Sequence, residues 1–287
     1  MAERTGGGRF VSFELWPPRS PESEHALELA LERLAVLGPA FVAITYGAGG
    51  STRERTHDLV VALVGSALLP LAHLTCAAHR RPELVELMQR YRGAGVDNLL
   101  ALHGDPPLSA AQDLPVGDLR YAVELVVLAR EVGFPGVGVA LHPEGHPAAP
   151  SRAADWQHQA GKLREADFGL TQFFHHSTDY FALVEQMRAR GAGAPVIPGV
   201  MPITNVRQLE RMATMSGASV PIELAQRLHA VADCPEEVRR IGIEHATVLC
   251  QELLDGGAPG LHFYTMNRAA ATLDVCSNLG FDAVRVP

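Results

Sequence analysis

The sequence predicts an α/β protein of the (β/α)8 TIM-barrel class. Short apolar runs recur along the chain, and most are followed by an amphipathic stretch with helical spacing. The runs are continuously apolar, which is typical of parallel strands covered by helices. Because barrels of this class commonly need about 250 residues, we expect the 287 residues to form a single catalytic domain, residues 1–287.

The predicted strands are spaced as successive strand–helix units. Helical patterns at 22–38, 52–66 and 81–95 separate the first four strands, and several patterns close on glycine, as helices often do. The interval before the last strand is longer, and its segments 220–231 and 234–257 predict extra helices there. The predicted strands lie at 9–15, 40–47, 69–76, 98–105, 136–143, 168–174, 195–202 and 260–267.

The composition indicates a soluble enzyme rather than a protein that binds nucleic acid or a membrane. The formal net charge of −8 disfavours both partners, because each would require a basic surface. The N-terminus has no apolar leader, no apolar run of about 18 residues occurs, and the cysteines are widely spaced. We therefore expect a cytoplasmic protein with reduced thiols.

Polar side chains stand at or near the ends of the predicted strands. Barrel enzymes carry their chemistry at the carboxyl ends of their strands. Several polar groups that converge on one rim after apolar runs therefore predict an active site. The residues at these positions are Glu14, Thr45, His73, Asp105, His142, Gln172, Met201 and Tyr264.

The stretch VSFELWPP, residues 11–18, ends its strand beside an acid. Glu14 is flanked in the sequence by Phe13, Leu15 and Trp16. An apolar environment disfavours a charged carboxylate, so we predict a raised pKa for Glu14. A raised pKa would suit a general acid near neutral pH. The alternative is a buried glutamate paired with an arginine.

Other chemistries find less support. The single lysine, Lys162, falls in the predicted fifth helix, which disfavours a Schiff-base mechanism. His142 and His146 lie in HPEGHP and lack the helical spacing of zinc ligands, so no metal site is predicted. We interpret the histidine pair at 175–176 as a solvated loop. The glycine-rich loop 47–52 could cradle a phosphate but lacks the Walker lysine.

The motifs FELWPP, VAITYGAGGSTRERT, LAHLTC, NLLALHGDPP, HPEGHP, LTQFF and HFYTMNRA occur in this order between about residue 9 and residue 280. Together they resemble the methylenetetrahydrofolate reductase family, in its bacterial type without a regulatory domain. The resemblance implies a (β/α)8 barrel, in agreement with the periodicity. It also implies reduction of 5,10-methylenetetrahydrofolate to 5-methyltetrahydrofolate by a nicotinamide nucleotide.

The resemblance implies a role for each matching residue. Glu14 matches the acid that protonates N10 of the folate, which opens the imidazolidine ring to an N5 iminium ion that can accept hydride. Asp105 matches an aspartate that contacts the pterin region and helps to polarise the redox centre. Gln172, Tyr264 and Asn205 match substrate-binding positions.

Flavin adenine dinucleotide is the usual hydride carrier of this family, and its contacts match the chain only in part. The positions that depart from the family pattern are His103, His142, His158, Gly161 and Val206. Each arginine contact to phosphate that is lost removes about 1.5–3 kcal/mol. We therefore expect FAD binding to be weak or absent, with NADH, or else NADPH, as the hydride donor. The positions compatible with cofactor binding are Thr45, His73, Gly104, Tyr121, Ala122, His146, Asp155 and Lys162.

Three alternatives stay open at this stage. His103, His158 and Lys162 could replace the missing contacts and hold flavin normally. The chain could be a folate-dependent methyltransferase on the same barrel, or a folate-binding protein without activity. The sequence does not predict an oligomeric state.

Overall fold

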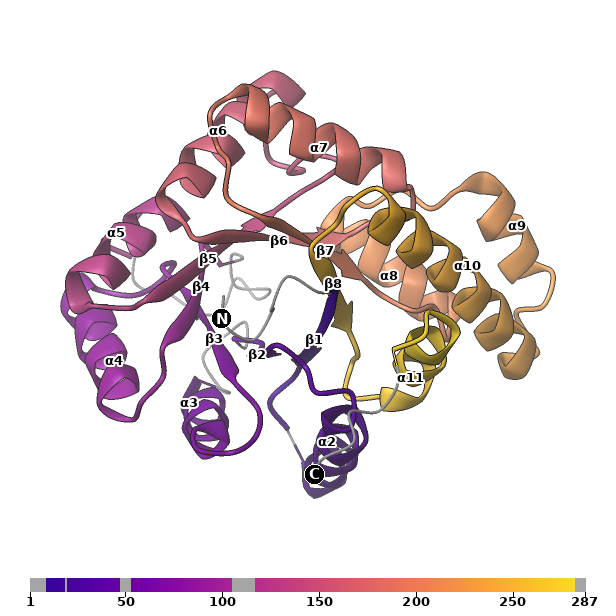
Figure 1. Cartoon of the computed structure of the whole chain (residues 1–287), viewed down its shortest axis with the longest axis horizontal. Helices are drawn as coiled ribbons and strands as arrows, with labels where there is room; N and C mark the ends of the chain where they lie inside the picture. Colours follow the sequence, from indigo (N-terminus) through magenta and orange to yellow (C-terminus); the bar gives the residue numbers. More distant parts are fainter. Residues whose placement is uncertain (1–8, 19, 47–52, 105–116, 282–287) are drawn as a thin grey trace, which may run out of the picture.

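The computed structural model of the chain describes residues 9–18, 20–46, 53–104 and 117–281. Eight parallel strands follow one another in sequence order and close into a barrel, in which β1 pairs with both β2 and β8 (Figure 1). The predicted fold class is therefore confirmed. The strands are β1 (Phe10–Leu15), β2 (Val42–Ile44), β3 (Pro70–Thr75), β4 (Asn98–Leu102), β5 (Gly136–Leu141), β6 (Phe168–Phe173), β7 (Val196–Val200) and β8 (Gly260–Tyr264).

Helices surround the barrel and alternate with its strands (Figure 1). Ser20, Ser151 and Asn205 accept backbone hydrogen bonds at the starts of three of them, as N-cap residues do. Within the described ranges, no helix is long and apolar enough to cross a membrane. The helices are α2 (Pro21–Ala35), α3 (Arg53–Leu63), α4 (Arg81–Gly93), α5 (Ala122–Val132), α6 (Arg152–Glu165), α7 (Ser177–Ala189), α8 (Val206–Ser216), α9 (Ile222–His229), α10 (Pro235–Asp255) and α11 (Ala269–Asn278).

The side chains of each strand alternate between two cores, because successive residues of a strand point to opposite faces. Phe13 and Leu15 of β1 belong to the large core between the strands and the helices, together with Leu27 of α2. Ser12 and Glu14 point the other way, into the barrel. Glu14 thus lies inside the barrel, one step from a residue that packs outside it.

The extra helices predicted before the last strand are confirmed, since α8, α9 and α10 all lie between β7 and β8. They share a smaller apolar core, which includes Phe173 from the end of β6. A Cβ atom on Gly242 of α10 would lie 1.9 Å from the Ile203 carbonyl oxygen. Only glycine allows this approach, and it brings α10 close to the rim at the end of β7.

A register shift between β6 and β7 alters the rim near Gln172. Leu170 pairs with Ile197, but the next pair is Phe173 with Gly199, so β6 contains one extra residue. Such a bulge re-aims the side chains beside it. The amide of Gly199 donates to Thr171 Oγ1 at 2.8 Å, which stabilises the bulge.

Candidate active site

Glu14 lies at the mouth of the barrel among side chains from three other strands or strand ends. Its Oε1 atom accepts a hydrogen bond from Thr45 Oγ1 at 2.7 Å. Its Oε2 atom lies 3.8 Å from His73 Nε2 and 3.9 Å from His262 Nε2. The residue is 7% exposed. The carboxyl group is therefore buried between two imidazoles, with one oxygen committed to a hydroxyl donor.

The predicted rise in the pKa of Glu14 is wrong. The prediction surrounded the acid with its sequence neighbours, but Phe13 and Leu15 face the helices, and Trp16 is 38% exposed. Burial alone would raise the pKa of the Glu14 carboxyl group. The adjacent imidazoles of His262 and His73 and the Thr45 hydroxyl outweigh burial, however, and the pKa lies below its ordinary value.

No arginine within the described ranges pairs with Glu14, so the arginine-paired alternative finds no support there. The partners are histidines, whose charge depends on pH. A carboxylate between titratable groups can exchange a proton with them, whereas a carboxylate held by arginine stays ionised. The arrangement therefore suits proton transfer.

The loop between β8 and α11 holds the backbone on which Glu14 stands. Thr265 Oγ1 donates to the Glu14 carbonyl at 2.8 Å. The side chain of Asn267 donates to the Trp16 carbonyl at 2.9 Å and accepts from its amide at 2.8 Å. Met266 and Asn267 have φ of 53° and 57°, a left-handed conformation that costs free energy in residues other than glycine. The contacts to β1 offset this cost and fix the acid.

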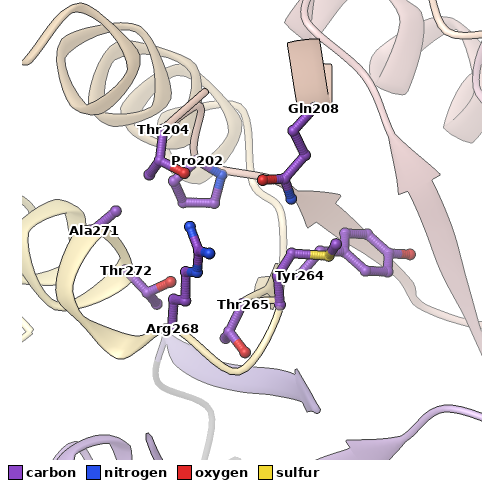
Figure 2. A pocket seen from close by; sticks show the side chains of 9 residues that line it. Pro202, Thr204, Gln208, Tyr264, Thr265, Arg268, Ala271 and Thr272 are labelled. Atoms are coloured by element: carbon purple, nitrogen blue, oxygen red, sulfur yellow. The ribbon is translucent and has the colours of Figure 1, made fainter. Parts of the chain in front are cut away.

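A small pocket adjoins this loop on the side of α8. Figure 2 shows the Arg268 guanidinium group reaching towards Pro202 and Thr204, while the Gln208 amide points towards the same space. Arg268 makes no ion pair with any described residue, so its charge is available to an anionic group. Sequence reasoning did not select Arg268 or Gln208 as site residues, although Arg268 lies within the motif HFYTMNRA. The pocket is lined by Pro202, Thr204, Gln208, Tyr264, Thr265, Met266, Arg268, Ala271 and Thr272.

The structure places Gln172 and Tyr264 at the same part of the rim. Tyr264 donates its hydroxyl hydrogen to the Thr171 carbonyl at 2.7 Å, and its ring meets Phe173 at a centroid distance of 6.4 Å. Gln172 Oε1 accepts from the Phe173 amide at 2.9 Å. Both residues thus lie at the bulge of β6. Their predicted substrate-binding roles stay predictions.

Asn205 has a structural task that the sequence analysis did not foresee. Its Oδ1 atom accepts from the Gln208 amide at 2.9 Å and caps the N-terminus of α8. The next residue, Val206, is 8% exposed and belongs to the core beneath α8 and α9. Asn205 retains its amide nitrogen for other contacts, and its substrate role stays a prediction.

The predicted cofactor residues at β5 and α6 form a connected group. The Asp155 carboxylate is 4% exposed and accepts from the His146 amide at 3.1 Å and from Gln159 Nε2 at 2.6 Å. The Gln159 side chain also bonds the His142 backbone in both directions. Burial lowers the pKa of Lys162 to about 8, against the opposing charge of Asp155. Asp155 thus serves mainly to shape the loop that carries His146.

The remaining predicted cofactor positions are separate from that group. Gly104 follows β4 with φ of 93°, and a Cβ atom there would lie 2.9 Å from Thr75 Cβ. Tyr121 and Ala122 begin α5, and the Tyr121 ring lies 5.9 Å from the His158 ring. Thr45 and His73 contact Glu14 instead, as described above. The cofactor assignments as a set stay predictions.

The interpretation of residues 175–176 as a solvated loop is wrong for the first of them. His175 is 5% exposed, and its Nδ1 atom lies 3.4 Å from Nε2 of His245 in α10. Burial lowers the pKa of His175 to about 3 and that of His245 to about 4. His176 is exposed. The contact with α10, which sequence spacing could not reveal, buries this imidazole.

Two predicted features lie outside the described residues. These are Asp105 and the glycine-rich loop 47–52. The histidine before Asp105, His103, is described, and its Nδ1 atom lies 2.7 Å from the Gly104 carbonyl oxygen. Among the residues that are described, no group of three or more histidine, cysteine, aspartate or glutamate side chains is arranged to hold a metal ion.

A buried acid at the carboxyl end of a parallel barrel, with titratable partners on β3 and β8, defines a barrel enzyme whose chemistry includes proton transfer. Comparison with known proteins identifies its family. Residues 2–280 match the family model for methylenetetrahydrofolate reductase, and the chain belongs to this family of oxidoreductases.

Curated relatives agree with this assignment. The 5,10-methylenetetrahydrofolate reductase of Escherichia coli K12 is 34% identical over 273 residues, which cover 94% of this chain and 90% of the relative. That of Pectobacterium carotovorum is 35% identical over 272 residues, with the same coverage. The Arabidopsis thaliana methylenetetrahydrofolate reductase (NADH) 1 is 32% identical, and the match covers 96% of this chain and 49% of the plant protein.

A solved structure supports the fold. It is an uncharacterised protein from Clostridium thermocellum that binds two copies of 5-methyl-5,6,7,8-tetrahydrofolic acid. The TM-score is 0.67 at 13% sequence identity, covering 96% of this chain and 95% of that one. At this identity, the likeness concerns the barrel alone.

Proposed function

We propose that the protein reduces 5,10-methylenetetrahydrofolate to 5-methyltetrahydrofolate, with NADH as the hydride donor and Glu14 as the group that protonates N10. Family membership supports the reaction, and the NADH-dependent plant relative supports the donor over NADPH. The observation that carries the assignment of Glu14 is its place inside the barrel mouth between two imidazoles.

The chemistry requires an acid before it requires a hydride. A proton on N10 makes this nitrogen a leaving group, the bond from N10 to the bridging carbon breaks, and an N5 iminium ion forms. Hydride then adds to the iminium carbon. An acid held beside N10 supplies the proton, and typical general acid catalysis contributes about 10²–10⁴-fold. The enzyme's other task is to hold donor and acceptor in contact.

The rim pocket offers a place for the acidic tail of a folate. Folates end in glutamate carboxylates, and the Arg268 guanidinium group can bind a carboxylate through two hydrogen bonds. The pocket adjoins Tyr264 and lies across the β8–α11 loop from the backbone of Glu14. A folate with its tail at Arg268 would extend its pterin towards the barrel mouth.

We propose further that hydride passes directly from NADH to the iminium carbon, without flavin. At the positions where the family holds the ribose and diphosphate of the flavin, this chain has His158, Gly161 and Lys162. His158 lies against Tyr121, Gly161 has no side chain, and the pKa of Lys162 is lowered to about 8. These residues fit a flavin diphosphate poorly, so no step is assigned to flavin.

The test is anaerobic oxidation of NADH by methylenetetrahydrofolate, using protein of recorded visible spectrum and without added flavin. Turnover by colourless protein, unchanged when FAD is added, would support direct hydride transfer. Turnover only by yellow protein, or only after FAD is added, would contradict it while upholding the reaction. Absence of turnover under both conditions would contradict the proposed function.

A further inference from the structure

A buried histidine of β8 faces Glu14 from inside the barrel. His262 is fully buried, and its ring stacks on Phe41 at a centroid distance of 5.6 Å. Its Nε2 atom has no hydrogen-bond partner among the described residues and lies 3.9 Å from Glu14 Oε2. A buried polar atom without a partner destabilises the folded state. His262 Nε2 thus lies beside Glu14 Oε2, the carboxyl oxygen to which Thr45 does not donate a hydrogen bond.

Ser12 holds the other nitrogen of the same ring. Ser12 Oγ lies 2.9 Å from His262 Nδ1 and 3.2 Å from the Leu261 carbonyl oxygen. A hydroxyl group can donate one hydrogen and also accept. If Ser12 donates to Nδ1, then His262 is neutral and its hydrogen lies on Nε2. If Ser12 donates to the Leu261 carbonyl, then Nδ1 can carry a hydrogen, and His262 can hold one proton or two.

We propose that Ser12, His262 and Glu14 form a proton relay in which His262 holds the proton that Glu14 delivers to the folate N10. The inference rests on the proposed function and deepens it. Glu14 remains the group that reaches the substrate. His262 and Ser12 are positioning residues, because they act through Glu14.

The relay balances the proton that the reaction consumes. The step starts from His262 with a hydrogen on both ring nitrogens and with Ser12 accepting from Nδ1. The proton on Nε2 passes to Glu14 Oε2, which leaves His262 neutral with its hydrogen on Nδ1, and Glu14 passes the proton to N10 as the bond between N10 and carbon breaks. The product keeps this proton on N10, and water that enters after product release returns one to the relay. The gap of 3.9 Å must close by about 1 Å to reach hydrogen-bond length. Rotation of the Glu14 side chain can provide this movement.

The other groups that face Glu14 do not serve this role equally well. They are Thr45, His73 and Tyr264. Burial lowers the pKa of His73, against the opposing charge of Glu14, so His73 is neutral near pH 7. No described residue accepts a hydrogen from His73 Nδ1, whereas the Ser12 hydroxyl oxygen lies 2.9 Å from His262 Nδ1 and can accept its hydrogen. Burial raises the pKa of Tyr264 well above its usual range, so its hydroxyl group does not exchange protons at neutral pH.

The first test is the pH profile of turnover in His262→Gln. Without His262, the proton must reside on Glu14 alone, whose pKa should rise because the largest of the influences that oppose burial is lost. We expect kcat at pH 7.5 to fall about 100-fold and to recover as the pH is lowered to about 6. Ser12→Ala should show the same profile with a loss of about tenfold, and it tests the relay even if His262→Gln fails to fold.

The matched control is His175→Gln. His175 is also a buried histidine whose Nε2 atom has no hydrogen-bond partner within the described ranges, but it does not contact Glu14. Its pH profile should match that of the unaltered protein. A loss in His262→Gln that is equal at every pH, or a profile like that of the control, would overturn the relay.

A measurement without substrate separates the relay from the proposed function. The infrared band of the protonated Glu14 carboxyl group, assigned by its absence in Glu14→Gln, reports the pKa directly. We expect the band to persist to higher pH in His262→Gln than in the unaltered protein. Identical titrations would overturn the relay whether or not the protein turns over folate. A shifted titration in a protein that does not reduce methylenetetrahydrofolate would overturn the proposed function and leave the coupling of Glu14 to His262 supported.

Discussion

His262 inside the barrel and His175 outside it are both buried histidines whose Nε2 atoms have no hydrogen-bond partner in the described part of the chain, yet their neighbours differ in charge. His262 faces the Glu14 carboxyl group. His175 faces another imidazole, that of His245, where the connection from β6 to α7 meets α10. A carboxylate stabilises a positive charge on an adjacent imidazole, whereas a second imidazole repels it. The interior site can therefore share a proton, and the exterior site excludes one.

Charged groups around the exterior pair strengthen this difference. Besides burial, His176 and Arg227 lower the pKa of His245, while Glu252 and Glu244 oppose them. Glu252 also accepts a hydrogen bond from Ser177 at 2.6 Å, so the start of α7 is tied to α10 twice. The exterior pair thus joins two helices and makes their contact sensitive to acid.

The largest expected effect comes from removing the carboxylate that distinguishes the interior site. Glu14→Gln keeps the shape of the side chain but cannot deliver a proton, so turnover of methylenetetrahydrofolate should fall about 100-fold or more. NADH binding, measured by fluorescence titration, should not change. Glu28→Gln is the control, because Glu28 lies 3.9 Å from His25 on the exposed surface. Full activity of Glu14→Gln would disprove its role as the acid.

The next effect is a loss of stability in acid, to which the exterior pair should contribute. The folded-state pKa of His175, about 3, lies below its unfolded value near 6.5. The unfolded state therefore binds more protons below pH 6.5, and stability falls as the pH drops from there towards 3. At pH 5 the loss from His175 alone should be about 2 kcal/mol. Urea unfolding at pH 7 and pH 5 measures it, and equal stability at both would contradict the burial of neutral imidazoles.

A change of the same size and opposite sign should result from His175→Phe. Phenylalanine fills similar space beside Phe173 and cannot be protonated, so the variant should recover about 2 kcal/mol of the stability lost at pH 5. His25→Phe, at an exposed position, should recover none of it. Urea unfolding of each variant at pH 7 and pH 5 measures how much stability is recovered. Undiminished acid sensitivity in His175→Phe would locate that sensitivity elsewhere in the protein.

The smallest effect is expected at Thr45. Thr45→Val removes the hydrogen bond to Glu14 Oε1, which is worth about 1 kcal/mol, and leaves both imidazoles in place. Turnover should fall by about tenfold or less, and the infrared band of protonated Glu14 should persist to higher pH. A loss as large as that of Glu14→Gln would mean that Thr45, rather than the histidines, controls the acid.

The eight strands could be predicted because each is an apolar run of suitable length between helical patterns. The surroundings of Glu14 could not, because its contacts Thr45, His73 and His262 come from other strands. Alternation along β1 would have sent Phe13 and Leu15 to the opposite face, and it would also have paired Ser12 with His262 once β1 and β8 were placed side by side. The burial of His175 could not be predicted from strand alternation. It depends on contact with His245 of α10, whose position is set by packing around Gly242.

The closure of the barrel also sets an order of events during synthesis. Thr265 lies 251 residues beyond Glu14, whose backbone it holds, and Ser12 is separated by 250 residues from His262. A ribosome delivers the first strand long before the last, and contacts between such distant residues form late. Until β8 has been synthesised, Glu14 therefore lacks its contacts with His262 and Thr265. The side chains around Glu14 are therefore brought together only after β8 has been synthesised, when most of the helices are already available to fold.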